Sequence, residues 1–598
     1  MSRFIASLFI LSVCALAVAG PAQADEFRPV TAEVLANPDP ADWLMINRTY
    51  DEQRFSPLNE INRTNVGKLR VAWVRGLPQG TQQSTPIVHQ GVMYVIAPGG
   101  GVQALDGSNG NLIWDYWRTY PKEMAWAIGP ATFSRSKNLA IFQDLVYFAA
   151  PDGYLVALDA RIGTVRWETK AHDYANGTEH TGGLMVADDK LISNRACKVR
   201  AGCFLAAHDA KSGRELWKFY NTPAPGEPGA DSWGNLPEER RSASSWGLPG
   251  SYDPKRKTTY WAIANPTPHT RLKRHGSTEA VPFAAPSELY SNSTVALDVN
   301  TGKLNWYYQH LPGDDWDSDH IHERTLVRTR VSPDPRFVKW INPTVAKGEV
   351  RDVVVEVAEA GYVFVLDRDT GKFLWAQPFP YDTPHRTLQS IDVETGRTNI
   401  NVSGMFKNDG DQRTICAFNT RSWWATSYDP GRNALYVPFQ DTCVRITANM
   451  GARTGDGPRV GIARPGIDEH AYAGIMKIDL STGEMTRIHT QRWPGNGSAL
   501  ATGGDLLFWG DLDRRFRAID PDSGKILWEL PLGGMIVAST ISYAVDGKQY
   551  IAVFTGEGLS GTRNVLANVP KLKTVQGHNA VYVFALPDGK QRRPDDNH

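Results

Sequence analysis

The sequence has no excess of charge of either sign, because 64 lysine and arginine residues balance 64 aspartate and glutamate residues. Binding to nucleic acid or to an anionic membrane surface needs a basic face, so this balance argues against both. The chain has 598 residues, of which 41% are hydrophobic and 21% charged, and it contains 54 glycines and 19 tryptophans. These counts indicate a large globular protein and exclude a disordered one.

Long hydrophobic runs are missing as well. The apolar run Phe4 to Ala19 follows Arg3 and ends after about sixteen residues, short of the roughly 20 that a helix needs to cross a bilayer. It leads into Ala22-Gln23-Ala24, which has the form of a signal-peptidase site. We therefore expect residues 1–24 to be a cleaved secretory signal and residues 25–598 to form the mature periplasmic protein. No later segment is long enough to predict a membrane span.

Cysteine is scarce. Cys14 lies in the expected signal, and the four others are Cys197, Cys203, Cys416 and Cys443. An even number of cysteines in an oxidising compartment, spaced six and twenty-seven residues apart, favours two local disulfides, although other pairings and buried free thiols stay open. No C-x-x-C-H motif occurs, so covalent c-type haem is excluded, and the spacing also excludes a zinc site built from paired C-x-x-C motifs.

What the sequence does contain is a repeat of the form A-x-D-x-x-x-G-x-x-x-W. Full copies begin at Ala104, Ala157, Ala207, Ala296 and Ala518, and weaker ones run from Val365 to Trp375 and from Lys477 to Arg487, where arginine replaces the tryptophan. Apolar residues before each aspartate predict a strand, the Asp-x-x-x-Gly segment predicts a tight turn, and the tryptophan lies on the return strand.

Such hairpins cannot bury their faces alone, so they must stack, and a radial stack of four-stranded sheets is a β-propeller. Seven hairpins, with closure of the ring by pairing of Leu69–Trp73 with Ala580–Ala585, predict an all-β, eight-bladed propeller with tryptophans wedged between blades. The whole mature chain would then be one domain. The irregular spacing places long insertions at about 219–290 and 376–470, where a binding site is usually built.

Many other segments resemble the quinoprotein alcohol dehydrogenases, a family that carries pyrroloquinoline quinone (PQQ) at the centre of an eight-bladed propeller. They are Tyr50 to Asn62, Ser84 to Val95, Val156 to Ala160, Tyr252 to Pro254, Ile263 to Pro266, Asp315 to Asp319, Gly503 to Asp520 and Asp546 to Gly556. The cysteine positions are most similar to the branch that contains lupanine hydroxylase, here without a haem domain.

The resemblance implies roles for three groups. Trp246 would form the flat floor under the quinone, although packing alone could also explain a tryptophan there. Asp317 would be the catalytic base that takes the alcohol proton, although an acidic solvated loop is the alternative. Asn265, with Asp317 and Asp319, would hold the family's metal, by default Ca2+, while the extra aspartate at 319 suits a lanthanide.

Contacts to the acidic cofactor are implied for a further set, which could equally contain ordinary surface arginines. Its members are Gln83, Arg135, Thr181, Arg421 and Trp423. Three positions depart from the family pattern. No acidic residue lies between Ala196 and Val199, where a metal-binding glutamate is expected. Glu359 stands where an arginine or lysine is expected before Gly361, and Trp126-Ala127 lies where the methanol enzymes have adjacent cysteines.

These features predict a periplasmic PQQ-dependent dehydrogenase that oxidises an alcohol, bulky or secondary, to a ketone or aldehyde. Without its own haem, the enzyme would pass electrons to a separate soluble cytochrome c or quinone. The alternative is a non-catalytic propeller scaffold of the cell envelope.

Overall fold

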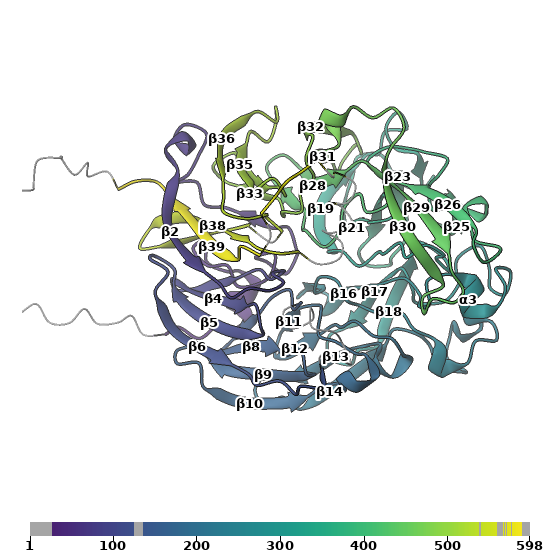
Figure 1. Ribbon diagram of the computed structural model, residues 1–598, viewed down its shortest axis with the longest axis horizontal. Helices are drawn as coiled ribbons and strands as arrows, with labels where there is room; N and C mark the ends of the chain where they lie inside the picture. Colours follow the sequence, from purple (N-terminus) through teal and green to yellow (C-terminus); the bar gives the residue numbers. More distant parts are fainter. Residues whose placement is uncertain are drawn as a thin grey trace, which may run out of the picture.

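The computed structural model describes residues 27–124, 135–537, 540–558, 566, 569, 571–575 and 577–588 (Figure 1). The expected signal, residues 1–24, and Trp126-Ala127 lie outside this part of the chain. Helices are short: α1 (Ala32–Ala36), α3 (Arg271–His275) and single 3-10 turns at Val66–Lys68, Tyr174–Asn176, Arg200–Gly202, Ala230–Trp233, Glu238–Arg240, Val402–Gly404 and Glu469–Ala471. Within the described residues, no helix is both long enough and apolar enough to cross a membrane. The fold is all-β, as the sequence predicts.

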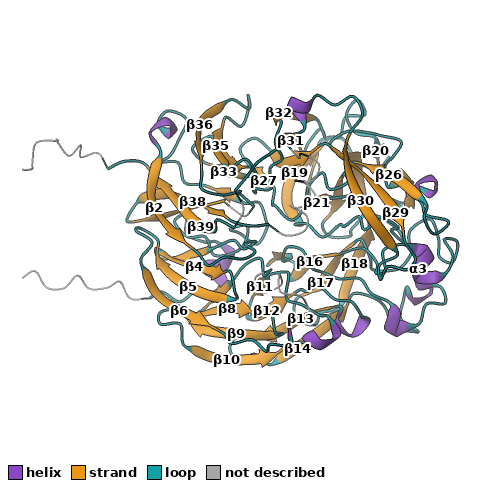
Figure 2. Ribbon diagram, in the orientation of Figure 1, coloured by secondary structure: helices purple, strands orange, loops and turns teal. Residues whose placement is uncertain are grey.

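In the part of the chain that the structure describes, eight antiparallel sheets contain four principal strands each. They follow one another around a common centre in chain order (Figures 1 and 2). Seven of them are β3–β6 (Ile87–His89, Val92–Ala97, Gly101–Asp106, Leu112–Trp117), β7–β10 (Ala140–Phe142, Leu145–Ala149, Tyr154–Asp159, Val165–Lys170), β11–β14 (Leu184–Ala187, Lys190–Ser193, Phe204–Asp209, Glu215–Tyr220), β15–β18 (Ser251–Asp253, Thr258–Ile263, Ser293–Asp298, Leu304–Gln309), β19 with β21–β23 (Thr325–Val331, Glu349–Val357, Tyr362–Asp367, Phe373–Pro378), β27, β28, β31 and β32 (Ser427–Asp429, Ala434–Gln440, Ala473–Asp479, Met485–Gln491), and β33–β36 (Leu500–Thr502, Leu506–Gly510, Arg515–Ile519, Ile526–Pro531). Short strands β1 (Phe55–Ser56) and β20 (Trp340–Ile341) extend two of these sheets.

The eighth sheet joins the two ends of the described chain. Strand β2 (Arg70–Gly76) pairs antiparallel with β39 (Ala580–Ala585), which continues into β38 (Lys548–Thr555) and β37 (Thr540–Val545). Trp73 lies opposite Val583 in this register. The pairing predicted from the sequence is therefore confirmed.

Tryptophans of the repeat reach from one sheet to the turn of the next. The indole nitrogen of Trp114 donates to the carbonyl of Ala160 at 3.0 Å, and its ring covers Gly163. A Cβ at Gly163 would meet that ring at 2.4 Å, and the φ of +72° there also favours glycine. The same indole-to-carbonyl bond joins Trp73 to Gly107, Trp167 to Ala210, Trp217 to Val299 and Trp306 to Arg368. These contacts bury the space between neighbouring sheets.

First strands of the sheets lie nearest the centre, as β11 does in Figure 1, and β3, β11 and β15 are buried along their whole length. Last strands such as β6 and β10 are largely exposed at the rim. Segments that lead into the first strands therefore converge on the centre, and this is where we look for a site.

The second insertion is not only loop. It contains the hairpin of β24 (Leu388–Ile391) and β25 (Thr398–Ile400), and the first two strands of the sheet that β31 and β32 complete. It also forms a separate three-stranded sheet of β26 (Gln412–Cys416), β29 (Thr442–Ala448) and β30 (Asp456–Ala463), which we call the inserted sheet. Disulfides join Cys416 to Cys443 within it and Cys197 to Cys203 elsewhere, as the spacing favoured.

Candidate active site

Five predicted residues precede the first strands of five different sheets. Gln83 precedes β3, Thr181 precedes β11, Trp246 precedes β15, Asp319 precedes β19 and Trp423 precedes β27. Because those strands line the centre, the topology brings together residues that lie hundreds of positions apart in the chain. The hydrogen bonds below link several of them.

Trp246 links the predicted cofactor floor to the predicted metal ligands. Its indole nitrogen donates to Asp319 Oδ2 at 3.0 Å. Asp319 Oδ1 accepts the backbone N–H of Asn265 at 3.1 Å, and the Asn265 side-chain amide donates to Asp317 Oδ1 at 3.0 Å. The three metal candidates and the tryptophan therefore form one continuous network. Because the amide nitrogen of Asn265 is used, its side-chain oxygen is left to face a cation.

The backbone around Asp317 is tightly fixed. Asp314 Oδ2 accepts the backbone N–H groups of Trp316, Asp317 and Ser318 at 3.2, 2.7 and 3.1 Å. Asp317 adopts a left-handed conformation with φ 69°, uncommon outside glycine. Its side chain is 28% exposed, unlike the buried Asp314 and Asp319. Of these carboxylates, Asp317 is thus the one that a molecule from solvent can reach.

Buried carboxylates gather beside Asp317. Burial, reinforced by the charge of Asp317, raises the pKa of Asp319 to about 7. Burial, with the charges of Asp319 and Asp317, raises the pKa of Glu359 well above its ordinary range. Among the described residues, none donates a hydrogen bond to the Glu359 carboxylate or forms an ion pair with it, although Glu359 is only 7% exposed. Such a concentration of buried carboxylate oxygens suits a hard cation.

A cationic and aromatic cluster lies beside Trp246. The ammonium nitrogen of Lys137 is 5.7 Å from the ring centroid of Trp246 and 4.7 Å from that of Trp423. Lys137 Nζ donates to Gln83 Oε1, and the Thr181 hydroxyl donates to the Trp246 carbonyl at 3.4 Å. Burial, together with the nearby charge of Arg135, lowers the pKa of Lys137 well below its ordinary value.

This cluster has unused polar atoms. Gln83 Nε2 and Arg135 Nε are buried and meet no hydrogen-bond partner in the described part of the chain. Two flat aromatic rings, a buried ammonium and unused donors fit a planar molecule that carries carboxylates. The residues present therefore fit PQQ.

The two predicted arginines are held differently. Arg135 Nη1 lies 3.4 Å from Glu179 Oε2, and Glu179 forms a backbone bridge with Ala196, so an acidic residue does lie beside the segment expected to carry one. Arg421 is fully buried and forms an ion pair with Glu323 at 2.8 Å. Arg421 is therefore a core residue, whereas the Arg135 side chain is 28% exposed.

A ring of four charged side chains, which we call the Asp317 ring, was missed by the sequence analysis. His269 Nε2 lies 3.2 Å from Asp317 Oδ1, and His269 Nδ1 lies 3.0 Å from Asp456 Oδ1. Arg459 Nη2 pairs with Asp317 Oδ2 at 3.0 Å and with Asp456 Oδ2 at 2.6 Å. Although burial opposes charge on His269, the carboxylates of Asp317 and Asp456 raise the pKa of this imidazole.

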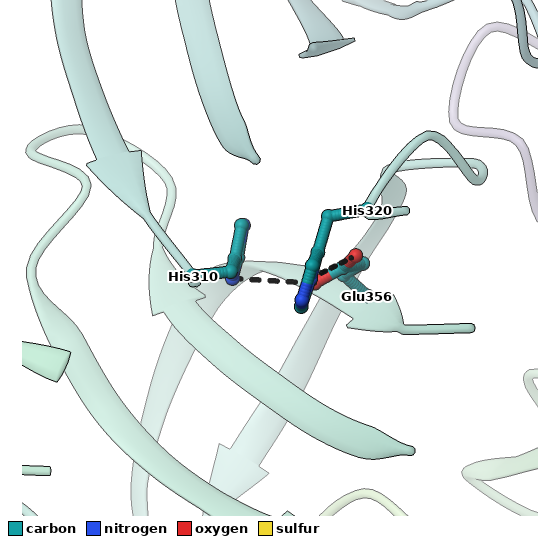
Figure 3. A group of neighbouring side chains, drawn as sticks. All are labelled: His310, His320 and Glu356. Atoms are coloured by element: carbon teal, nitrogen blue, oxygen red, sulfur yellow. Dashed lines mark hydrogen bonds and ion pairs between the residues drawn. The ribbon is translucent and has the colours of Figure 1, made fainter. Parts of the chain in front are cut away.

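A second cluster lies in the core beside this site (Figure 3). His310 and His320 both turn their Nδ1 atoms to Glu356, at 3.2 and 3.0 Å, and all three residues are fully buried or nearly so. Arg324 Nη1 lies 3.6 Å from Glu356 Oε1 and already offsets its charge. Because His320 follows Asp319 directly, this cluster anchors the segment that carries Asp319.

Comparisons with known proteins show what the chain as a whole is similar to. The family described as "Glucose/ethanol/alcohol dehydrogenase, beta-propeller domain", designated PQQ, matches residues 43–380 and 472–551. The chain is 29% identical to quinohemoprotein alcohol dehydrogenase ADH IIB of Pseudomonas putida, over 92% of this chain and 78% of the relative. It is 28% identical to a lanthanide-dependent methanol dehydrogenase of Methylacidiphilum fumariolicum (strain SolV), over 92% and 93% of the two chains.

Solved structures are similar over the same extent. A europium-containing methanol dehydrogenase superposes with a TM-score of 0.80 at 25% identity, covering 92% of this chain and 99% of that one. Quinohemoprotein alcohol dehydrogenase ADHIIG of Pseudomonas putida HK5 gives a TM-score of 0.78 at 25% identity, covering 95% and 84%. The family match leaves out residues 381–471, the stretch that contains the inserted sheet.

Proposed function

The chain belongs to the family of PQQ-dependent alcohol dehydrogenases, and on that premise we propose that it oxidises an alcohol to a ketone or aldehyde with PQQ bound over Trp246. The observation that carries the proposal is the hydrogen bond from the Trp246 indole to Asp319. It joins the aromatic floor to the carboxylates, so one molecule on that floor can lie within reach of both the base and an ion.

Asp317 takes the proton of the substrate hydroxyl in this proposal. A general base must lie within hydrogen-bond reach of the proton that it removes, and Asp317 is the solvent-accessible carboxylate of the network. The hydroxyl proton goes to the carboxylate, the C–H hydrogen leaves with its two electrons, and the carbon–oxygen bond becomes a carbonyl. Bound PQQ supplies the two-electron acceptor, and an ion beside it supplies Lewis-acid polarisation.

The ion would be held by Asn265, Asp317 and Asp319, with Glu359 as a further carboxylate. Two of the relatives are named for lanthanide or europium, and Asp319 and Glu359 add negative charge that suits a trivalent ion. Ca2+ is the alternative occupant of the same oxygens. Contacts to the cofactor would come from Lys137, Gln83, Thr181, Trp423 and Arg135. Arg421 would act indirectly, by supporting the turn that carries Glu359.

We further propose that the eight sheets are the blades of one propeller domain spanning residues 25–598, exported to the periplasm by residues 1–24. The repeat tryptophans would dock neighbouring blades. Electrons would pass to a separate cytochrome c or quinone, because the sequence has no C-x-x-C-H motif. A bulky or secondary alcohol is the proposed substrate, since each insertion contributes a residue, His269 or Arg459, that contacts Asp317.

Purified protein loaded with PQQ and either Ca2+ or a lanthanide should reduce an artificial electron acceptor when given secondary alcohols. Asp317→Asn should keep PQQ bound and reduce kcat by at least about 10²-fold, because the base is lost and the shape is kept. If the wild-type protein neither binds PQQ nor reduces the dye with any alcohol, the scaffold function is favoured instead.

A further inference from the structure

The inserted sheet lies against the base-bearing segment. Val444 and Ile446 of β29 belong to the same buried cluster as Trp316, which immediately precedes Asp317. The Trp316 indole donates to the carbonyl of Gly404 at 2.8 Å, which ties that segment to the chain leading into β26. The position of Asp317 therefore depends on packing that the insertion supplies.

Polar contacts dock the tip of the β29–β30 hairpin as well. The backbone N–H of His269 donates to the carbonyl of Thr454 at 2.8 Å, and Lys273 Nζ donates to the carbonyl of Met450 at 2.6 Å. Thr270 caps the following helix α3 by accepting the N–H of Lys273. The hairpin thus holds His269, one member of the Asp317 ring, from its backbone side.

Hydrogen bonds to Asp456 hold the side chain of Arg459, on β30, in the direction of Asp317. Its Nε and Nη2 atoms both donate to Asp456 Oδ2, at 2.8 and 2.6 Å, so the guanidinium is fixed before it meets Asp317 Oδ2 at 3.0 Å. The Arg459 side chain is 20% exposed and its guanidinium carbon lies 5.8 Å from the ring centroid of Phe418. A planar guanidinium held in this way fixes the direction of the carboxylate that it contacts.

Arg459 also supplies positive charge among several buried carboxylates. Asp314, Asp315, Asp319 and Glu359 are all buried near Asp317, and Glu359 occupies the position where the sequence led us to expect a cation. Arg459 lies close enough to act electrostatically on Asp317, Asp314 and Glu359. Arg459, from a different segment, thus supplies a positive charge within electrostatic reach of Glu359.

We propose that Arg459 is a positioning residue for the Asp317 base, and that the inserted sheet exists in this chain to deliver it. The proposal deepens the proposed function and rests on it. Arg459 orients Asp317 Oδ2 while His269 and Asn265 hold Oδ1, so that the carboxylate faces the substrate hydroxyl in one direction only. Preorganisation of this kind acts on turnover more than on substrate binding.

The test compares Arg459→Ala with Arg445→Ala in the holoenzyme. Arg445 is exposed on β29 of the same sheet, so its loss removes equal charge without touching the ring. We expect Arg459→Ala to lower kcat by about 10²-fold with KM within threefold of wild type, and PQQ affinity unchanged. The primary isotope effect with C-deuterated alcohol should rise, and added guanidinium ion should restore part of kcat. Arg445→Ala should match wild type.

A kcat for Arg459→Ala equal to that of wild type would overturn the proposal, as would a loss explained entirely by lost PQQ. If the alanine variant does not fold, Arg459→Lys takes its place: about a tenfold lower kcat is expected, because a lysine keeps the charge but cannot hold both carboxylates as a fork. Wild-type turnover in Arg459→Lys would contradict the inference. Failure of the wild-type enzyme itself to bind PQQ would instead refute the proposed function, so the two outcomes are distinguishable.

Discussion

The indole nitrogen of Trp246 lies 3.0 Å from Asp319 Oδ2 and donates a hydrogen bond to it. The ring proposed to support the cofactor and the carboxylate proposed to face an ion are thereby bonded to each other. Asp319 is buried and its other oxygen accepts the Asn265 N–H, so the two hydrogen bonds together fix the direction of the carboxylate. The proposed cofactor site and the proposed ion site are therefore coupled, so a change in one should alter a measurable property of the other.

Terbium luminescence should report this coupling. Energy passes from an excited indole to a bound Tb3+ only over short distances, so Trp246→Phe should lower tryptophan-excited terbium emission several-fold while Tb3+ still binds. Trp117→Phe, at an exposed position on β6, is the matched control and should leave the emission unchanged. Equal emission from wild type and Trp246→Phe would place the ion away from Asp319.

Asp319 should discriminate between ions. Asp319→Ala removes one anionic oxygen, which costs a trivalent ion more than a divalent one. We expect lanthanide-supported dye reduction to be lost and Ca2+-supported reduction to be retained. The measurement is activity after reconstitution with each ion, beside the ion content of the protein. An equal loss with both ions would contradict a special role for this carboxylate.

Lys137 should control cofactor affinity. Lys137→Met keeps the length of the side chain and removes the ammonium, so a carboxylate of PQQ would lose a charge-assisted hydrogen bond worth about 1.5–3 kcal/mol, or roughly 10- to 100-fold in Kd. Titration of apoprotein with PQQ, followed by quenching of tryptophan fluorescence, measures this. The variant should also unfold at a higher temperature, since it no longer buries an ammonium. Unchanged affinity for PQQ would show that Lys137 does not contact the cofactor.

Acid should destabilise the fold through Glu288. Burial alone would raise the pKa of this carboxyl, but Arg274 and His275 outweigh burial and lower it from 4.5 to about 2. The folded pKa is depressed, so the stabilisation, on the order of 3 kcal/mol, is present above pH 4.5 and is lost as the pH falls towards 2. Glu288→Gln should lower the melting temperature strongly at pH 7 and much less near pH 3. Asp334→Asn, in an exposed pair with Arg336, should differ little from wild type at either pH.

Much of the fold follows from local sequence, because each interface between sheets is encoded in two neighbouring copies of the repeat. Trp114 and Gly163 lie in neighbouring copies, and each restricts the other: the tryptophan needs a flat surface and the glycine provides one. Such pairs recur at fixed spacing, so reading along the chain predicts the strands, the turns and the closure of the ring. The inserted sheet has no counterpart in the repeat, and the sequence predicts its three strands only as part of a long insertion.

The site was predictable only in part. Trp246, Asn265, Asp317 and Asp319 stand in segments whose pattern is recognisable, and the structure brings these four together. Lys137 was overlooked in favour of Arg135, although it precedes β7 by the same three residues by which Thr181 precedes β11.

No comparable signal marks Arg459 or Asp456. The pairing of Arg459 with Asp317 spans more than a hundred residues and depends on how the inserted sheet packs against Trp316. A charged pair three residues apart on a strand looks like many others, so only the fold reveals its partner.

Pairing of β2 with β39 has a consequence for biogenesis. Strand β2, near the start of the described chain, can find its neighbour only when β39, the last strand, has been synthesised. Until then β2, which carries Trp73, has no strand to pair with, and an apolar sheet edge stays exposed. The earlier sheets can form from local hairpins, but the ring of sheets closes only when β2 pairs with β39, two strands from opposite ends of the described chain. A ribosome that stalls shortly before Ala580 would therefore leave the ring open, although every segment that carries a residue of the candidate site would already have been made.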